Sequence, residues 1–286
     1  GFSGVMTRIS ENFANDPKKV IKYWDANNLY GYSMIQKLAN KFLGEIQTRD
    51  FLENECLSWS RDGDFAYFVL VDYHIPVELH DRFEKFAPLI SKKSVKSAEV
   101  SFENRVLKEV RATEAGTKLC STLEDGTDYL MDWENFLFYE RMGYEMIVKR
   151  VYKFEQTAFL KPYIDMNSGL RQRSSTALSK QLYKDLNNII YGKSLQNPMK
   201  YGNVELITSE TILQNRVRNP LLKRCEIIVD DKLVLTDLYK EKMKFDTCIQ
   251  YGFHVLEKSK HLMYTTLYEK IVPFCERHGV EWKLLM

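Results

Sequence analysis

The chain has 286 residues, of which 44% are hydrophobic and 28% are charged, with a formal net charge of +2 at pH 7. This composition is typical of a globular protein that can bury a sizeable core, in one large domain or two small ones. The nearly neutral balance argues against a surface that is basic throughout, so any basic surface must be local.

The five cysteines are odd in number, widely spaced and without a Cys-x-x-Cys pair: Cys56, Cys120, Cys225, Cys248 and Cys275. This pattern predicts reduced thiols in an intracellular protein and argues against a zinc site. No run approaches 18 apolar residues and no signal peptide opens the chain, so we expect no membrane partner and a nuclear, cytoplasmic or mitochondrial location. The chain starts at Gly1 and stops in the apolar run 282–286, and we expect both ends to be cut from something longer.

The first informative stretch is a short strand followed by a turn and a helix start. Residues 20–24 are β-branched and aromatic and predict a strand, and Asn27 and Asn28 follow as turn and cap residues. Asp25 then lies at a strand end. A carboxylate there, beside the backbone carbonyl of Ala26, suits a hard cation that needs oxygen ligands and room for phosphates.

Tyr30 lies one helical turn beyond this cap, so its ring could flank whatever Asp25 holds. The alternative interpretation is purely structural. In that interpretation Asp25 caps the helix and Tyr30 belongs to the core.

The rest of the chain alternates predicted strands and helices, which indicates an α+β protein without internal repeats. Residues 65–73 form the clearest strand, since sheet formers run almost without interruption. The further predicted elements are a hairpin at 124–126, a helix over 132–142 capped by Asp132 and ended at Gly143, a strand over 145–154, a short helix over 160–168 ending at Gly169, a helix over 178–194, short strands with one helix and a hairpin at 230–231 between 203 and 246, and a helix over 255–274.

The last of these helices places Met263, Leu267 and Ile271 at a spacing of four residues. We interpret this stripe as core packing. The five histidines show no convincing metal spacing and are expected to be structural or at the surface: His74, His80, His254, His261 and His278.

The helix over 178–194 carries a second group of functional candidates. Lys180, Lys184, Asn188 and Tyr191 lie on one side at 3.6 residues per turn. Gly192 follows, where the missing side chain permits another molecule to approach closely. The opposite side is expected to bury the helix through apolar residues: Leu182, Leu186, Ile189 and Ile190.

Positive charge is concentrated around this helix. Between Arg171 and Lys200 there are six basic residues and one acid, a net charge of +5. Fixed cations opposite a metal-bound carboxylate suit the binding of a triphosphate. The alternative interpretation is an ordinary solvated helix face.

Two stretches resemble motifs of family B DNA polymerases. Asp25-x-x-Asn28-Leu29-Tyr30-Gly31 resembles the first palm motif, Asp-x-x-Ser-Leu-Tyr-Pro. Lys184-x-x-x-Asn188-Ile189-x-Tyr191-Gly192 resembles the second motif, Lys-x-x-x-Asn-Ser-x-Tyr-Gly. The motifs stand in the expected order, 159 residues apart. The departures at positions 28 and 31 resemble the protein-primed branch found in organelles, viruses, linear plasmids and Maverick/Polinton transposons.

The resemblance implies a palm of antiparallel sheet and helices, a helical fingers hairpin and two insertions, incomplete at both ends. It divides the chain as follows: 1–44, palm with the first motif; 45–158, an insertion similar to the terminal-protein-binding region plus palm strands; 159–200, fingers with the second motif; 201–250, a second insertion; and 251–286, palm that stops before the third motif.

The resemblance also implies roles for single residues. Asp25 is the catalytic residue and binds two Mg²⁺ ions together with an aspartate of a later Asp-Thr-Asp motif, with the Ala26 carbonyl as a further ligand. Tyr30 packs under the sugar of the incoming nucleotide and rejects a 2′-hydroxyl. Lys184, with Arg171 as a looser match, binds the dNTP triphosphate.

Asn188, Tyr191 and Gly192 match the face that lies against the nascent base pair. The implied partners are a DNA template and primer, a dNTP and a terminal protein primer.

No Asp-Thr-Asp sequence occurs in these 286 residues. One of the two metal sites is therefore expected to be incomplete, and the chain alone is predicted to be an inactive or very poor polymerase. A second hypothesis is a catalytically inactive remnant that retains DNA or nucleotide binding. A third, an unrelated nucleotide-binding or interaction module, does not explain why both motifs arrive in order.

Overall fold

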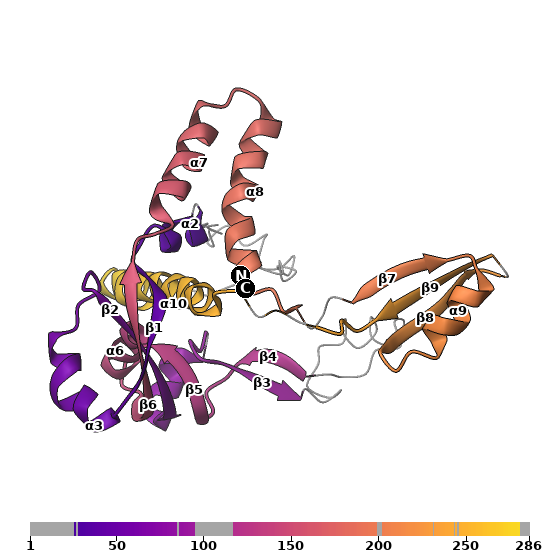
Figure 1. Ribbon diagram of the computed structural model, residues 1–286. Helices are drawn as coiled ribbons and strands as arrows, with labels where there is room; N and C mark the ends of the chain where they lie inside the picture. The colour runs from indigo at the N-terminus through magenta and orange to yellow at the C-terminus, as the bar shows by residue number, and fades with distance from the viewer. Residues whose placement is uncertain are drawn as a thin grey trace, which may run out of the picture. The chain divides into compact units, whose positions relative to one another are not determined.

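The computed structural model of the chain describes residues 26, 28–84, 86–94, 117–198, 202–230, 232–242, 244 and 246–280. These residues form helices and antiparallel sheets, which confirms the α+β class (Figure 1). The chain divides into two compact units, of which the first is discontinuous in sequence. Unit 1 contains Gly1–Asp165 and His254–Met286, and unit 2 contains Met166–Phe253.

The elements of unit 1 that precede unit 2 are α2 (Leu29–Met34), β1 (Leu38–Ile46), α3 (Thr48–Asp50), η1 (Phe51–Glu55), η2 (Cys56–Ser58), β2 (Phe65–His74), η3 (Val77–Leu79), α4 (His80–Phe83), β3 (Ile90–Ser94), β4 (Thr117–Ser121), β5 (Gly126–Asp132), α6 (Trp133–Arg141) and β6 (Glu145–Thr157). The elements that return to unit 1 after unit 2 are α10 (Ile249–Thr265), which begins in unit 2, η6 (Thr266–Ile271) and α11 (Val272–Arg277).

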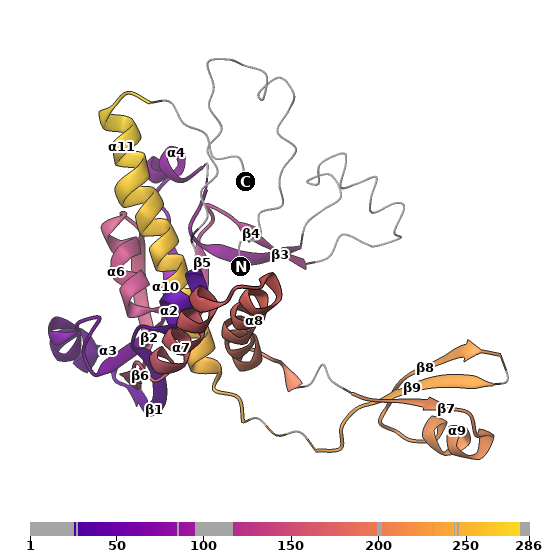
Figure 2. The same cartoon turned by 90° about the horizontal axis from the view of Figure 1, so that it is seen from above.

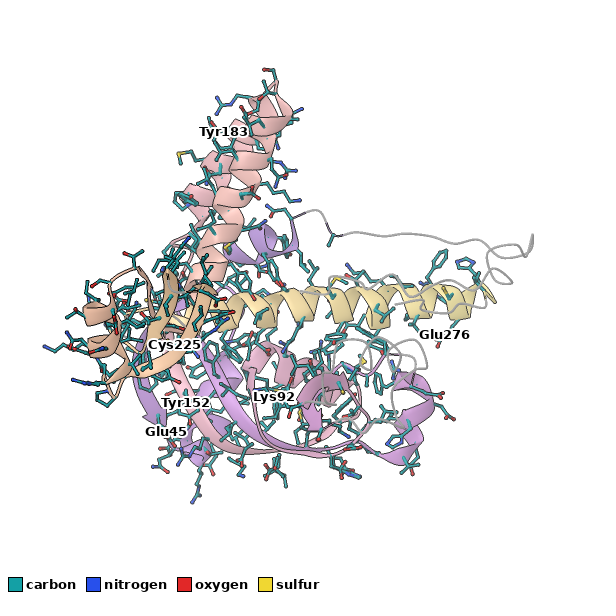
Figure 3. All side chains as sticks on the ribbon, turned by 90° about the vertical axis from the view of Figure 1, so that its right-hand side faces the viewer. Glu45, Lys92, Tyr152, Tyr183, Cys225 and Glu276 are labelled. Carbon is teal, nitrogen blue, oxygen red and sulfur yellow. The ribbon has the colours of Figure 1, made fainter. Side chains whose placement is uncertain are left out.

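The main sheet of unit 1 has the strand order β1-β6-β2-β5, and every neighbouring pair is antiparallel. β2 is an inner strand, and both of its faces are covered along most of its length. This explains why its sequence is an almost unbroken apolar run instead of an alternating one. Glu45 of β1 and Tyr152 of β6 are partners in the register and lie near each other at the foot of the sheet in Figure 3.

The core of unit 1 lies between this sheet and two helical segments, α6 and the continuous run of α10, η6 and α11. α10, η6 and α11 form one long rod, and α6 lies along it (Figure 2). The buried residues that fill the core include Val69, Val71 and Tyr73 of β2, Phe138 and Tyr139 of α6, and Tyr264, Tyr268 and Val272 of the rod. α6 begins and ends as predicted, because Asp132 accepts a hydrogen bond from the Glu134 amide and Gly143 follows with a φ of 98°.

Unit 2 combines a helical hairpin with a small three-stranded sheet. Its elements are α7 (Lys161–Arg173), which begins in unit 1, α8 (Ala177–Ser194), β7 (Asn203–Ile207), α9 (Glu210–Val217), β8 (Leu222–Val229) and β9 (Leu233–Leu238). The strand order is β7-β9-β8, again antiparallel. The β8–β9 hairpin confirms the turn predicted at 230–231.

The hairpin predicted at 124–126 is wrong. The flanking strands exist as β4 and β5, but β4 pairs with β3 whereas β5 pairs with β2. The reason is visible at Asp125, whose carboxylate accepts hydrogen bonds from the Ile75 amide at 3.0 Å and from the His74 ring at 2.8 Å. These bonds tie the turn to the end of β2 and prevent it from closing a local hairpin.

The helix predicted to end at Gly169 continues to Arg173 as α7. Gly169 has no positive φ and therefore does not terminate the helix. Packing supports the helix here, because Asn167, two residues before Gly169, is buried and donates a hydrogen bond to Asn187 of the neighbouring helix α8.

The stripe predicted on the last helix is displaced by one residue. Met263, Leu267 and Ile271 are only partly buried. Tyr264, Tyr268 and Val272 are the buried residues instead. Across the part of the chain that the structure describes, no helix is both long enough and apolar enough to cross a membrane.

Candidate functional site

Helix α2 carries the described part of the first motif. Its N-cap is Asn28, which adopts a left-handed conformation (φ 55°, ψ 51°) and makes no capping hydrogen bond with its side chain. Tyr30 is partly buried, and Gly31, Ser33 and Met34 are buried. Asn28 therefore occupies the predicted cap position without performing the predicted cap chemistry.

The structure describes only part of the metal site predicted at Asp25 and Ala26. Asp25 and the strand expected over 20–24 lie outside the described residues, while Ala26 is described and exposed. Among the residues that the structure describes, no group of three or more His, Cys, Asp or Glu side chains could hold a metal ion. The binding of Mg²⁺ by Asp25 and the Ala26 carbonyl thus stays a prediction.

The second motif lies on α8, which forms an antiparallel hairpin with α7 (Figure 1). Thr176 caps α8 by accepting a hydrogen bond from the Ser179 amide at 3.2 Å. Asn167 of α7 donates to Asn187 of α8 at 3.0 Å, and both amides are buried. A hydrogen bond between two buried amides fixes how the two helices are rotated against each other.

This contact positions the predicted cations. Arg171 lies one turn after Asn167 on α7, and Lys184 lies one turn before Asn187 on α8. Because the helices are antiparallel, both cations lie on the same side of the contact, toward the tip where α7 passes into α8. Tyr183 marks this region in Figure 3. Arg171 and Lys184 are both exposed.

The polar face predicted for α8 is accessible. Lys180, Lys184 and Asn188 are exposed, and Tyr191 is partly buried. Gly192 is also exposed, and a Cβ atom built on it would meet no atom within 4 Å. The motif therefore presents an open surface at its glycine.

The apolar face predicted to bury α8 is only partly buried, so that prediction is wrong for two residues. Leu182 is 53% exposed and Ile189 is 60% exposed, whereas Leu186 and Ile190 are partly buried. The described contacts of α8 are centred instead on Asn187 and, one and two turns later, Ile190 and Ser194. A polar amide pair determines the buried face, which apolar periodicity could not reveal.

Most cations of this hairpin have no acidic partner among the described residues. Lys161 is paired with Asp165 at 2.6 Å, and Asp185 accepts from Gln181. Among the described residues of unit 2 and of α7, no carboxylate forms an ion pair with Arg171, Arg173, Lys180 or Lys184. Counting from Lys161 to Ser194, six basic residues face two acids, a net charge of +4.

The three-stranded sheet of unit 2 has a different electrostatic character. The cations of its strands and of α9 pair with neighbouring acids: Arg216 of α9 with Glu205 at 2.9 Å, Lys223 with Asp237 at 3.1 Å, and Arg224 with Glu226. The net positive charge of unit 2 is thus concentrated on the helical hairpin, as the sequence predicted.

The C-terminal end of α8 is packed against the beginning of α10. Tyr251 Oη donates to the Ile190 carbonyl at 3.3 Å, and Ser194 Oγ donates to the Tyr191 carbonyl at 2.7 Å. A Cβ atom on Gly252 would overlap Ser194 Oγ and approach the Leu195 side chain to 2.9 Å. Gly252 is therefore required where the two helices meet.

The candidate residues fall into two sets. Ala26 and Tyr30 belong to unit 1, and the described set in unit 2 comprises Arg171, Lys184, Asn188, Tyr191 and Gly192.

A buried polar cluster in unit 1 was not predicted. It lies between α6 and α10 and contains Asp132, Glu134, Asn135, His254, Glu257, Lys258, Ser259 and His261. The spacing of His254, Glu257, Lys258 and His261 along one side of a helix is the signal that could have indicated it.

Comparison with known proteins gives only a distant likeness. No family model matches the chain, and no curated protein matches it. Solved structures of phi29 DNA polymerase are similar: an orthorhombic crystal form (14% identity, 85% of this chain, TM-score 0.49), the post-translocation complex with primer-template DNA (15%, 87%, 0.44), and the ternary complex with primer-template DNA and incoming nucleotide substrates (16%, 86%, 0.48).

The chain spans only about a third of the length of those polymerases, 34% to 35%. At these identities and TM-scores the likeness establishes neither a family nor a function for the chain.

Proposed function

We propose that these 286 residues form palm and fingers elements of a DNA-directed DNA polymerase of family B, from the protein-primed branch. The observation that carries the proposal is the second motif. Lys184 and Asn188 are exposed on α8 and Arg171 is exposed on α7, and within the described part of the chain most cations of this hairpin form no ion pair with a carboxylate. Such a surface suits the triphosphate of an incoming nucleotide.

The roles proposed for the first motif follow from its sequence. Asp25 and the Ala26 carbonyl would hold Mg²⁺, which when bound supplies charge neutralisation at the phosphates and activation of the primer 3′-hydroxyl. Tyr30 would lie under the nucleotide sugar and exclude a 2′-hydroxyl. Lys184 and Arg171 would orient the triphosphate, while Asn188, Tyr191 and Gly192 would lie against the nascent base pair.

The proposed division of the chain is the one given by the motifs. Palm elements occupy 1–44 and 251–286, and fingers helices occupy 159–200. The segments 45–158 and 201–250 are proposed as insertions, the first of them contacting a terminal protein primer. The described ion pairs around Glu205 and Asp237 make the sheet within 201–250 close to neutral, so we expect this insertion to contribute little to phosphate binding.

We further propose that the 286-residue chain is a very poor polymerase by itself, because it contains one of the two aspartates that a two-metal site needs. The second candidate function is nucleotide or DNA binding without turnover. The two candidates differ in whether primer extension occurs at all.

Nucleotide binding tests the proposal. Mg²⁺-dependent binding of dNTPs by the 286-residue chain should be lost in Asp25→Ala and weakened about tenfold or more in Lys184→Ala, the factor expected for a charge-assisted hydrogen bond. Lys232→Ala, an exposed lysine at the β8–β9 turn, is the matched control and should bind normally.

Salt-sensitive DNA binding that is indifferent to both variants would instead support the binding-only alternative. Robust primer extension by the chain that depends on Asp25 would overturn the proposed inactivity.

A further inference from the structure

Helix α2 is held in place mainly by contacts from outside itself. It has six residues, a glycine in its interior, no acidic residue in its first turn and no side-chain cap. A helix this short and this poorly capped is not stable alone. Tertiary contacts must therefore determine its position, and with it the position of Tyr30.

The described contact that reaches deepest into α2 comes from α10. Ser33 is fully buried, and its hydroxyl lies 2.9 Å from the hydroxyl of Ser259. Ser259 Oγ donates to the Val255 carbonyl at 2.7 Å, so it accepts from Ser33, whose single proton is shared between Ser259 Oγ at 2.9 Å and the Leu29 carbonyl of α2 at 3.2 Å. The two hydroxyls thus join α2 to the backbone of α10, and the Ser33–Ser259 contact is the shorter of the two that Ser33 Oγ makes.

A second bond from α10 fixes the segment just after α2. The Ala39 amide donates to Nδ1 of His254 at 3.0 Å, and both residues are buried. Since Nδ1 accepts, the proton of the neutral ring is on Nε2, which faces Asp132 Oδ2 at 3.4 Å. The path from α2 into β1 is thus attached to α10 at two points, Ser33 and Ala39.

α10 can serve as a fixed base because buried charges attach it to α6. Asn135 donates to both the backbone carbonyl and the carboxylate of Glu257, at 3.0 and 2.8 Å. Lys258 lies 3.6 Å from Glu134. A polar group buried in such a network loses much of its stabilisation if it moves, so the network resists displacement of α10.

We propose that Ser259 is a positioning residue for nucleotide selection, acting through Ser33 on α2. Ser33 and Tyr30 are three residues apart and so lie on adjoining positions of the same helix face. Loss of the Ser33–Ser259 hydrogen bond lets α2 shift, and the ring of Tyr30 shifts with it. This inference rests on the proposed function, in which Tyr30 discriminates against the 2′-hydroxyl.

The first measurement compares the affinity of the 286-residue chain for Mg²⁺·dGTP and Mg²⁺·GTP. Ser259→Ala and Ser33→Ala are each expected to reduce the preference for dGTP by about threefold to tenfold, the factor that one hydrogen bond represents. The double variant should reduce it no further, because both substitutions remove the same bond.

Thr265→Val is the matched control. Thr265 also lies on α10 and its hydroxyl donates to a carbonyl four residues earlier, at 2.6 Å, as Ser259 does, and no described contact joins it to α2. This variant removes one hydroxyl from the same helix and should leave the dGTP preference unchanged.

The second measurement is amide hydrogen exchange, which needs no nucleotide. In Ser259→Ala the Tyr32 and Ile35 amides, which donate to Asn28 and Gly31 within the α2 turn, should exchange several-fold faster. The Met142 amide at the end of α6 should change only by the loss of global stability.

Equal changes in α2 and α6 would overturn the proposal, and so would an unchanged dGTP preference in a wild-type chain that discriminates. If exchange accelerates in α2 but the wild-type chain binds neither nucleotide, the proposed function fails and takes the selection role with it, while the contact between the helices stands. The two failures are therefore distinguishable.

Discussion

The side-chain amide of Asn28 lies in the space that a Cβ atom on Gly31 would occupy. Asn28 is held there by its left-handed backbone, a conformation that asparagine tolerates better than most residues. These are the two positions at which residues 25–31 depart from the family B motif that they resemble. The departures thus form a matched pair, because a proline at position 31 would require a different side-chain position at 28.

This relationship predicts that the effect of Gly31→Ala on stability changes sign when Asn28 is also replaced. Gly31→Ala should destabilise the chain by about 1 to 2 kcal/mol, since the new methyl group must displace Asn28. In an Asn28→Gly background, which keeps the left-handed conformation accessible, the same substitution should be neutral or stabilising by about 0.5 kcal/mol, the usual gain of alanine over glycine in a helix. Urea unfolding of the four chains measures the coupling, and additive effects would contradict it.

The buried pair of Glu134 and Lys258 gives a second prediction. Lys258→Met should cost about 1 to 3 kcal/mol, because the buried Glu134 carboxylate keeps its ion pair with Arg61 but loses Lys258. Adding Glu134→Gln should restore part of the loss. Chemical unfolding of the wild type, both single variants and the double variant measures the coupling between the two side chains. Lys41→Met and Glu155→Gln form an exposed control pair, which should couple by less than about 1 kcal/mol.

The stability of unit 1 should depend on pH through the buried His254 and the partly buried His261. Burial lowers the pKa of His254, which faces Asp132, Lys258 and Glu134, and the pKa of His261, which faces Glu134, Arg61 and Asn135. The unfolded chain therefore binds more protons below about pH 6.5, and the free energy of unfolding falls as the pH falls through this range. Each histidine contributes up to about 1.4 kcal/mol per pH unit.

Urea unfolding between pH 5 and pH 8 measures this slope, which His254→Gln and His261→Gln should reduce. His74→Gln is the control. Its exposed ring has a raised pKa because of the hydrogen bond to Asp125, so it acts with the opposite sign and its removal should not reduce the slope. A stability that is flat from pH 5 to pH 7 in the wild-type chain would contradict the prediction.

Two glycines of unit 2 should respond in opposite ways to alanine. Gly252→Ala should destabilise the packing of α10 on the end of α8 by about 1 to 3 kcal/mol, because the methyl group overlaps Ser194. Gly192→Ala has open space around it and should stabilise α8 by about 0.5 to 1 kcal/mol. Thermal unfolding distinguishes the two.

Gly192→Ala also tests the second motif. If Gly192 lies against the nascent base pair, this more stable variant should bind primer-template DNA and dNTP less well than the wild-type chain. Unchanged binding would remove the close-approach role of Gly192 and leave Lys184 and Asn188 as the candidates on α8.

Local patterns predicted the elements well. β2 follows from its run of sheet formers, α6 from Asp132 and Gly143, and α8 from its periodicity, because each of these signals acts within a few residues. The errors concern which strands pair and which helix faces pack against each other. Nothing near Asp125 in the sequence indicates that β5 pairs with β2, more than 50 residues away, and not with β4.

The candidate site shows the same division. The exposure of Lys184 and Asn188 was predictable from helical spacing. The buried Asn167 and Asn187 pair was not, because an asparagine alone gives no sign of its partner, and it determines which face of α8 is covered. Buried charges such as Glu257 and Lys258 were missed for a similar reason, since composition places such residues at the surface. The role of Asp25 stays a prediction.

The discontinuity of unit 1 has a consequence for synthesis on the ribosome. β1 pairs with β6 across about 110 residues of chain, and the core of unit 1 receives Tyr264, Tyr268 and Val272 only after unit 2 has been made. The nascent sheet must therefore wait with an open apolar face while 88 intervening residues, Met166–Phe253, emerge and acquire their own structure. A ribosome that stalls before Val272 leaves that face uncovered, and such a nascent chain is a natural client for chaperones.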